Sequence, residues 1–165
     1  MFIIDTHLDI ALNALEYNRD YRLPASAIRA SEQGMTDKID RSNNVVSLPD
    51  LRRGNIGLVV ATQIARVNSN NKNLPGAGWN SPPQAWAMTQ AQRAWYEAME
   101  AEGEMVQINS QATLNAHVAR WLDTSKPAVD KPIGYVLSLE GADSLIDLSY
   151  LERAYAYGLR AIGPA

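Results

Sequence analysis

Three residues have the side-chain types and positions needed to bind a divalent metal ion. His7 and Asp9 lie two positions apart just after an apolar run at 2–4, and Glu140 ends a second apolar run at 133–139. Residues two apart on a strand point to the same side, so both side chains can bind one cation. Taken alone, His-x-Asp is a weak pattern, and a solvated strand end is the simpler interpretation. The coincidence of all three residues at strand ends favours a metal site.

Few other residues are candidates for catalysis. The chain has no cysteine, which excludes a disulfide scaffold, a thiol catalyst and a cysteine-ligated metal. The second histidine, His117, lies within a helical pattern and is predicted to be a surface or interfacial residue. Asp5 is interpreted as an acid that supports the fold or the ligands. The sequence also lacks the glycine-rich nucleotide motifs and the Gly-x-Ser-x-Gly motif of serine hydrolases.

The elements that must position these residues alternate between strands and helices. This alternation predicts right-handed crossovers and a parallel sheet. The connections that leave the first two strands, 16–44 and 66–79, are long and polar, which predicts a site at the carboxyl ends of the strands. Open α/β sheets share this asymmetry with β/α barrels, so it locates the site without fixing the fold. The expected strands cover 2–4, 56–64, 133–139 and 159–162, with a short extended piece at 105–108.

Capping residues and apolar spacing predict the helices. A helix is expected near 10–17, and Ser47 starts a short one that ends at Gly54. Ser81 and Gln84 form the pattern of a capping box for a long helix to about Glu102. Further helices are expected after the caps Ser110 and Ser149. The faces predicted to point inward are Met88, Ala91, Trp95 and Met99 in the long helix, and Leu114, Val118, Trp121 and Leu122 in the next.

The composition is that of a soluble globular protein. Of the 165 residues, 46% are hydrophobic and 20% charged, and the formal net charge is −3. There is no basic excess for binding nucleic acid, and no apolar run is long enough for a signal sequence or a membrane span. We therefore expect a cytoplasmic protein with no nucleic-acid or membrane partner. The length suits one medium domain or part of a larger one.

Four segments resemble the membrane (renal) dipeptidase family. Residues 5–9, Asp-Thr-His-Leu-Asp, resemble its first motif, Asp-x-His-x-Asp at the end of the first strand, and 137–142 resemble its second, a strand ending in Glu-Gly. Residues 51–57 are similar to its Leu-x-x-Gly-Gly-Val-Gly segment, and 151–162 to a helix followed by Gly-x-Arg. Ala142 replaces the second glycine usual after the glutamate. The resemblance extends over essentially the whole chain.

The resemblance implies a fold, a cofactor and an activity. The fold is a (β/α)8 TIM-type barrel, of which residues 1–165 form the N-terminal part of a single domain. Two zinc ions are implied, with His7 and Asp9 on one ion and Glu140 bridging both. By the same resemblance, the two zinc ions would supply a hydroxide that attacks the peptide bond of a dipeptide. The family's remaining histidine ligands and its catalytic aspartate come from later strands, beyond Ala165. This chain is therefore expected to bind zinc at most partly and to be inactive alone.

Two other interpretations stay open. The chain is either part of another metal-dependent barrel hydrolase of the amidohydrolase type, or a non-catalytic half-barrel that pairs with another chain. The usual His-x-His pair of the amidohydrolases is absent, so His-x-Asp favours the dipeptidase. An open half-barrel exposes strand edges, which predicts a homo-oligomer or pairing with the missing C-terminal half.

Overall fold

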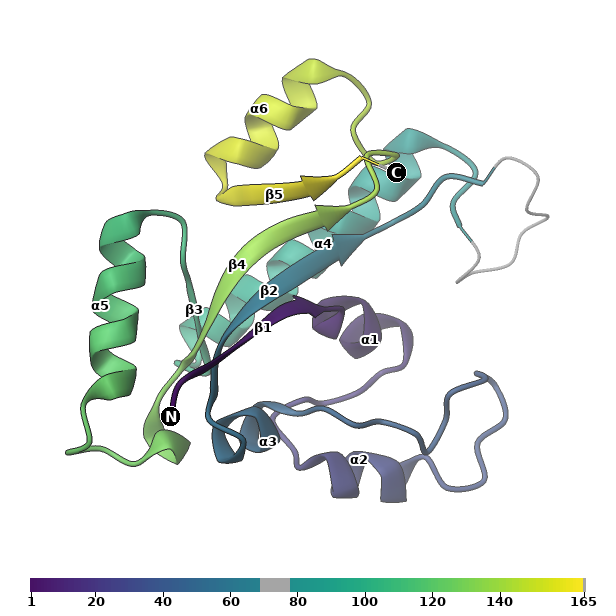
Figure 1. Cartoon of the computed structure of the whole chain (residues 1–165). Helices are drawn as coiled ribbons and strands as arrows, with labels where there is room; N and C mark the ends of the chain where they lie inside the picture. The colour runs from purple at the N-terminus through teal and green to yellow at the C-terminus, as the bar shows by residue number, and fades with distance from the viewer. Residues whose placement is uncertain (69–77, 165) are drawn as a thin grey trace.

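A parallel sheet of five strands forms the centre of the fold (Figure 1). The structure, a computed structural model, describes residues 1–68 and 78–164. The strands are β1 (Ile3–Leu8), β2 (Ile56–Ile64), β3 (Met105–Gln107), β4 (Ile133–Glu140) and β5 (Leu159–Gly163). They are paired in the order β1-β2-β4-β3, and β5 also pairs with β4.

Strands β3 and β5 pair with different parts of β4. The start of β4 pairs with β3, where Met105 lies opposite Ile133, and its end pairs with β5, where Glu140 lies opposite Gly163. At their carboxyl ends the strands therefore follow one another in chain order, β1-β2-β4-β5, without a reversal. The parallel sheet that the alternating pattern predicted is confirmed.

Strand β1 is longer than the sequence predicted. The apolar run ends at Ile4, whereas the strand continues to Leu8. The strand continues because β2 runs alongside it, with Asp5 opposite Val59 and Leu8 opposite Ala61, and the register is irregular between these two pairs. His7 therefore belongs to the strand itself rather than to a following loop.

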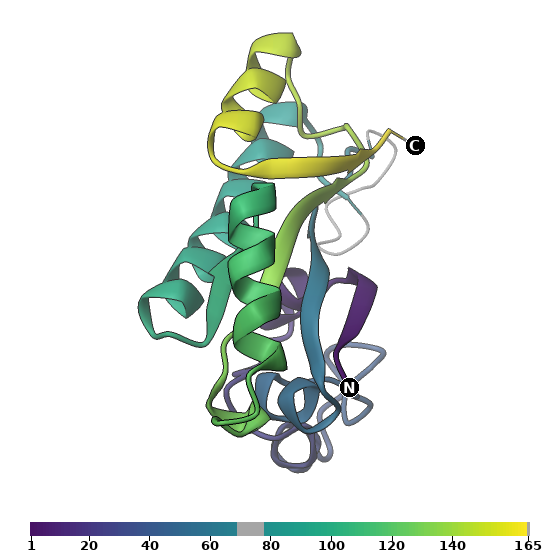
Figure 2. The same ribbon diagram turned by 60° about the vertical axis from the view of Figure 1, so that its left-hand side comes forward.

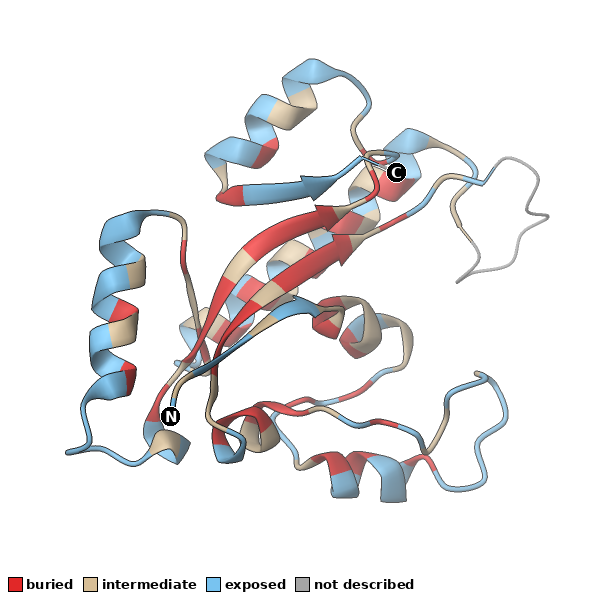
Figure 3. Cartoon of the chain, in the orientation of Figure 1, coloured by how far each residue is buried: buried red, intermediate tan, exposed pale blue. Residues whose placement is uncertain are grey.

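The two middle strands carry the core. Figure 3 shows that most of β2 and β4 is buried, whereas β1 and β5 are largely exposed. Ile4 on β1 and Ile162 on β5 are among the exposed large apolar residues. The sheet thus has two buried central strands, β2 and β4, and two exposed edge strands, β1 and β5. Edge strands have unpaired backbone groups that are available for pairing.

Every helix predicted from the sequence is present. Within residues 1–68 and 78–164, none of the helices combines the length and the apolar character needed to cross a bilayer. The helices are α1 (Ile10–Glu16), α2 (Ala25–Ser31), α3 (Leu48–Arg53), α4 (Pro82–Ala101), α5 (Gln111–Leu122) and α6 (Leu148–Ala156), with a 3-10 turn at Ala128–Asp130.

Helix α2 lies in a segment that the sequence predicted to be irregular. Its first residue, Ala25, donates its N–H to Asp50 of α3 over 2.8 Å. The charges around it are paired, because the buried Glu32 accepts from Arg19 at 2.7 Å and from Arg41 at 2.9 Å. The hydrogen bond from Arg19, helped by Arg41, lowers the pKa of Glu32 to about 2. Hydropathy alone does not reveal a core built from paired charges.

The buried face of helix α4 only partly matches the predicted one: Met99 is buried and Trp95 packs against the core, as predicted. Ala91, expected inside, is exposed. The Gln92 carboxamide instead accepts from the N–H of Ile64 at 2.8 Å and donates to the carbonyl of Ile64 at 2.7 Å. A buried glutamine is favourable here because β2 satisfies both of its polar groups. The buried stripe consists of Ala85, Thr89, Gln92, Tyr96 and Met99.

Two predicted helix caps also differ. Ser81 is the N-cap of α4, but its hydroxyl donates to the side chain of Gln84 at 3.1 Å rather than accepting a backbone N–H. Helix α6 begins after Asp147, whose carboxylate accepts the N–H of Ser149 at 2.8 Å. Ser149, predicted as the cap, is therefore inside the helix, since the aspartate earlier in the chain caps as well and suits the helix dipole.

Helix α5 buries His117, which the sequence predicted at a surface or an interface. The histidine is only 3% exposed, and its Nε2 lies 2.7 Å from the carbonyl oxygen of Gly57. The rings of Phe2 and Trp121 lie 6.3 and 6.4 Å from it. Leu122, predicted to point inward, is 61% exposed. Figure 2 brings α5 forward and shows it beside the start of β4, away from the carboxyl ends of the strands.

Candidate metal centre

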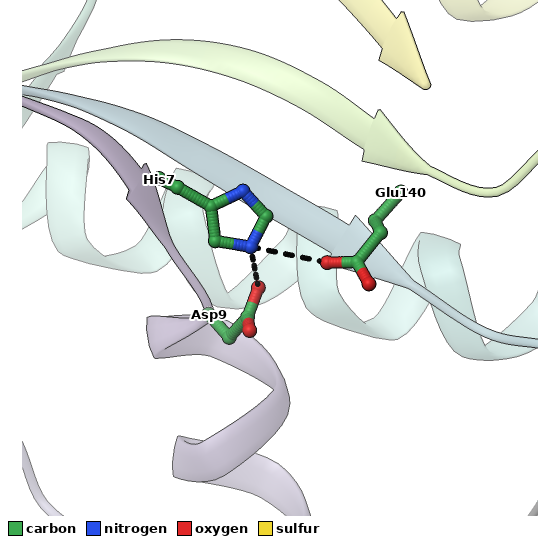
Figure 4. Close-up of side chains that lie close together, drawn as sticks. All are labelled: His7, Asp9 and Glu140. Carbon is green, nitrogen blue, oxygen red and sulfur yellow. Dashed lines mark ion pairs between the residues drawn. The ribbon is translucent and has the colours of Figure 1, made fainter. Parts of the chain in front are cut away.

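The three predicted ligands come together at the carboxyl ends of the strands. His7 lies near the end of β1, Asp9 is the N-cap of α1, and Glu140 is the last residue of β4. Nε2 of His7 lies 3.5 Å from Oδ1 of Asp9 and 3.1 Å from Oε2 of Glu140 (Figure 4). One ligand atom from each residue lies within 4.8 Å of the others. Segments more than 130 residues apart thus meet because parallel strands end at one edge.

The donor atoms fit a zinc ion. Zinc binds imidazole nitrogen and carboxylate oxygen at about 2.0–2.1 Å, so two ligands of a tetrahedral ion lie about 3.3 Å apart. The separations of 3.1 and 3.5 Å around His7 bracket that value. An ion can reach the group from solvent, because the side chains of His7, Asp9 and Glu140 are 59%, 34% and 25% exposed. Among the residues that the structure describes, no other such group of His, Asp and Glu exists.

Neighbouring polar groups orient the ligands. The buried Thr62 of β2 donates its hydroxyl to Oδ1 of Asp9 in a short hydrogen bond. The carbonyl of Thr62 in turn accepts from the hydroxyl of Tyr96 on α4 at 2.9 Å. Asp5 accepts the backbone N–H of His7 at 3.0 Å, so it supports the strand and does not join the three ligands. These contacts hold Asp9 and His7 from β2 and from within β1.

The site also contains a cation that the sequence did not identify. Arg66, two residues past the end of β2, donates from Nη2 to Oε1 of Glu140 at 2.8 Å. In the sequence it begins a polar loop, and nothing in its neighbours indicates where its side chain points. The one available signal is its position, because Ile64 at the end of β2 lies opposite Glu140 in the sheet.

One cavity adjoins the candidate ligands, and a second lies beside Arg66. One of about 220 Å³ lies over β2, β4 and β5 and is lined by both His7 and Glu140. The other, of about 300 Å³, contains Arg66 and is walled by Leu12 and Trp79. His7 and Glu140 therefore border open space, as a site that must admit a second molecule requires.

Comparison with solved structures shows which proteins share this fold. The chain superimposes on dipeptidase AC, described as a metallopeptidase of family M19, with a TM-score of 0.66 and 19% identity. This chain therefore shares its fold with part of that dipeptidase. The probable dipeptidase PvdM from Pseudomonas aeruginosa matches with a TM-score of 0.60 and 14% identity. The resemblance to dipeptidases that the sequence motifs indicated is thus confirmed at the level of the fold.

The extent of these matches is uneven. All of this chain is covered, but it spans 43% of the first dipeptidase chain and 34% of the second. No protein-family model and no curated protein sequence matches the chain. The mixed α/β fold with a parallel sheet is therefore shared with dipeptidases, whose chains are more than twice as long.

Proposed function

We propose that residues 1–165 form the N-terminal part of a zinc-dependent dipeptidase, with His7, Asp9 and Glu140 as metal ligands. The observation that carries the proposal is the convergence of these three donors on one point at the carboxyl ends of β1 and β4. The same fold in two dipeptidase chains supports it. Active sites of β/α folds lie at this end of the strands.

We further propose that the sheet is part of a (β/α)8 barrel. The strands β1, β2, β4 and β5 follow one another in chain order, as neighbours in a closed barrel do. A doubly wound sheet instead reverses its strand order at a switch point. The strands β1, β2, β4 and β5 show no such reversal, and the short β3 pairs only with the start of β4. The exposed edge strands β1 and β5 are the two sides on which further barrel strands would pair.

The chemistry follows from the donors and their supports. A bound zinc ion would act as a Lewis acid, which polarises a carbonyl and makes water a stronger nucleophile. The neutral imidazole of His7 and the carboxylates of Asp9 and Glu140 would hold it. Thr62 fixes the orientation of Asp9 through its hydroxyl. The adjoining cavity of about 220 Å³ lies beside His7 and Glu140, where the peptide bond of a dipeptide must lie to reach the ion.

Zinc titration of the 165-residue chain tests the proposal. We expect calorimetry to detect zinc binding in the wild-type chain. His7→Gln and Glu140→Gln each remove a donor, so we expect affinity to fall at least about tenfold. Asp143→Asn is the matched control, because this exposed carboxylate lies three residues after Glu140 and outside the metal group. The proposal fails if the wild type binds no zinc, or if D143N weakens binding as much as E140Q does.

A cobalt-loaded sample tests the substrate class. Cobalt(II) takes similar ligands and absorbs visible light according to its coordination. We expect a dipeptide to change the absorption spectrum of the cobalt-loaded chain, and a single amino acid amide of similar size to leave it unchanged. Equal responses to both compounds would contradict recognition of dipeptides while leaving the metal site intact.

A further inference from the structure

The two oxygens of Glu140 have different partners. Oε2 lies 3.1 Å from Nε2 of His7, whereas Oε1 accepts from Nη2 of Arg66 at 2.8 Å. A carboxylate that bridges two metal ions needs one free oxygen for each ion. Here one oxygen faces the other ligands and the second faces a guanidinium, which keeps its positive charge at every physiological pH.

We propose that Arg66 acts as a fixed positive charge beside the metal site, holding Oε1 of Glu140 and leaving Oε2 for a single divalent cation. This inference rests on the metal binding proposed above. It differs from the bridging role that the sequence motifs implied for Glu140, because the guanidinium takes the place of a second ion.

The position of Arg66 is built into the sheet. Ile64 lies opposite Glu140 in the pairing of β2 with β4, so a residue just beyond Ile64 is within reach of that carboxylate. Gln92 bonds both backbone groups of Ile64, which fixes the end of β2 two residues before the arginine. The backbone carbonyl of Arg66 itself accepts the N–H of Trp79 at 2.7 Å. The guanidinium therefore starts from a fixed point beside Glu140.

The charge of Arg66 opposes a second ion at Oε1. A divalent cation there would lie within a few ångströms of the guanidinium, so the two like charges repel, and water around the Arg66 side chain, which is 61% exposed, screens part of that repulsion. The same repulsion acts more weakly on the first ion, so Arg66 also lowers the affinity of the site.

Cobalt and zinc titrations of three arginine variants test the inference. Arg66→Met removes the charge, and Arg66→Lys keeps it. Arg53→Met removes an equal charge from α3, where Arg53 pairs with Asp50 far from the ligands, so it controls for net charge. We expect one equivalent of metal in the wild-type chain. We expect R66M to bind about tenfold more tightly, with R66K and R53M within about threefold of the wild type.

The outcomes separate this inference from the function. R66M binding no more tightly than R53M would overturn the role of Arg66 and leave the metal site standing. Two equivalents in the wild type, both lost in Glu140→Gln, would restore a bridging glutamate and overturn the single-cation inference. Absence of any metal binding in the wild type would overturn the proposed function, and this inference with it.

Discussion

The two histidines lie at opposite ends of the same sheet and meet opposite conditions. His7, at the carboxyl ends of the strands, is 59% exposed and faces two carboxylates. His117, at the amino ends, is buried between aromatic rings, and burial lowers its pKa. Its Nε2 donates to the carbonyl of Gly57, and its Nδ1 has no hydrogen-bond partner among the described residues. One end of the sheet therefore brings together exposed candidate metal ligands, and the other end is closely packed.

The packed end should account for far more stability than the site. Trp121 is buried beside His117 and donates its indole N–H to Pro132 at 2.9 Å. We expect Trp121→Ala to lower the free energy of unfolding by about 3–5 kcal/mol in urea denaturation, because it leaves a large cavity. Leu122→Ala, one residue later on the exposed face, should cost less than about 0.5 kcal/mol. Equal losses would show that α5 does not stabilise this end.

The binding end should stabilise the fold only when it holds a metal. Zinc at about one hundred times its dissociation constant is expected to raise the free energy of unfolding by about 2.7 kcal/mol. His7→Gln should abolish this increment, while His117→Gln should keep it despite a lower starting stability. The measurement is urea denaturation with and without zinc. An increment that survives in H7Q but vanishes in H117Q would reverse the comparison.

The close packing around His117 depends on glycine. A Cβ added to Gly134 would lie 2.5 Å from Nε2 of His117, closer than any real contact of this kind. We expect Gly134→Ala to cost about 1–3 kcal/mol through overpacking, measured by thermal or urea denaturation. Gly163→Ala on β5 is the control, since nothing lies within 4 Å of its added Cβ. Equal stability of the two variants would contradict close packing around His117 at the amino ends of the strands.

The smallest expected effect is on pH dependence. The pKa of His117 is lowered in the folded state, first by burial, so the unfolded chain binds the proton more tightly. This histidine therefore contributes stability above its ordinary pKa near 6.5, and that contribution is lost as the pH falls further. The decline between pH 7.5 and 5 should be smaller in His117→Gln than in the wild type. Leu122→Ala, which removes no titratable group, should keep the wild-type decline.

The convergence of the three candidate metal ligands could be predicted from the sequence because its signals are local. Polar residues that directly follow apolar runs must lie at strand ends, and parallel strands bring their carboxyl ends to one edge. His7, Asp9 and Glu140 therefore follow from three short segments. Arg66 does not, because the direction of its side chain depends on the register of β2 against β4.

The packed end could not be predicted because its partners are distant in the chain. Helix α5 has the sequence of an ordinary amphipathic helix. His117 is buried because Gly134 leaves room for its ring, and Gly57 leaves room for the neighbouring rings of Phe2 and Trp121. Part of the predicted buried face of α4 was wrong for a related reason. Gln92 is polar, and its burial depends on backbone groups of a strand 28 residues away. Satisfied polar groups inside a core have no hydropathy signal.

The hydrogen bonds of Gln92 also connect helix α4 to the end of β2, close to the candidate metal ligands. Both bonds are made to one residue, Ile64, so a shift of α4 along its own axis would also shift the end of β2. Two residues before Ile64 is Thr62, which donates a hydrogen bond to Asp9. Two residues after it is Arg66, which donates one to Glu140. A substitution on α4 that does not contact the candidate ligands can therefore change the distance between Asp9 and Glu140.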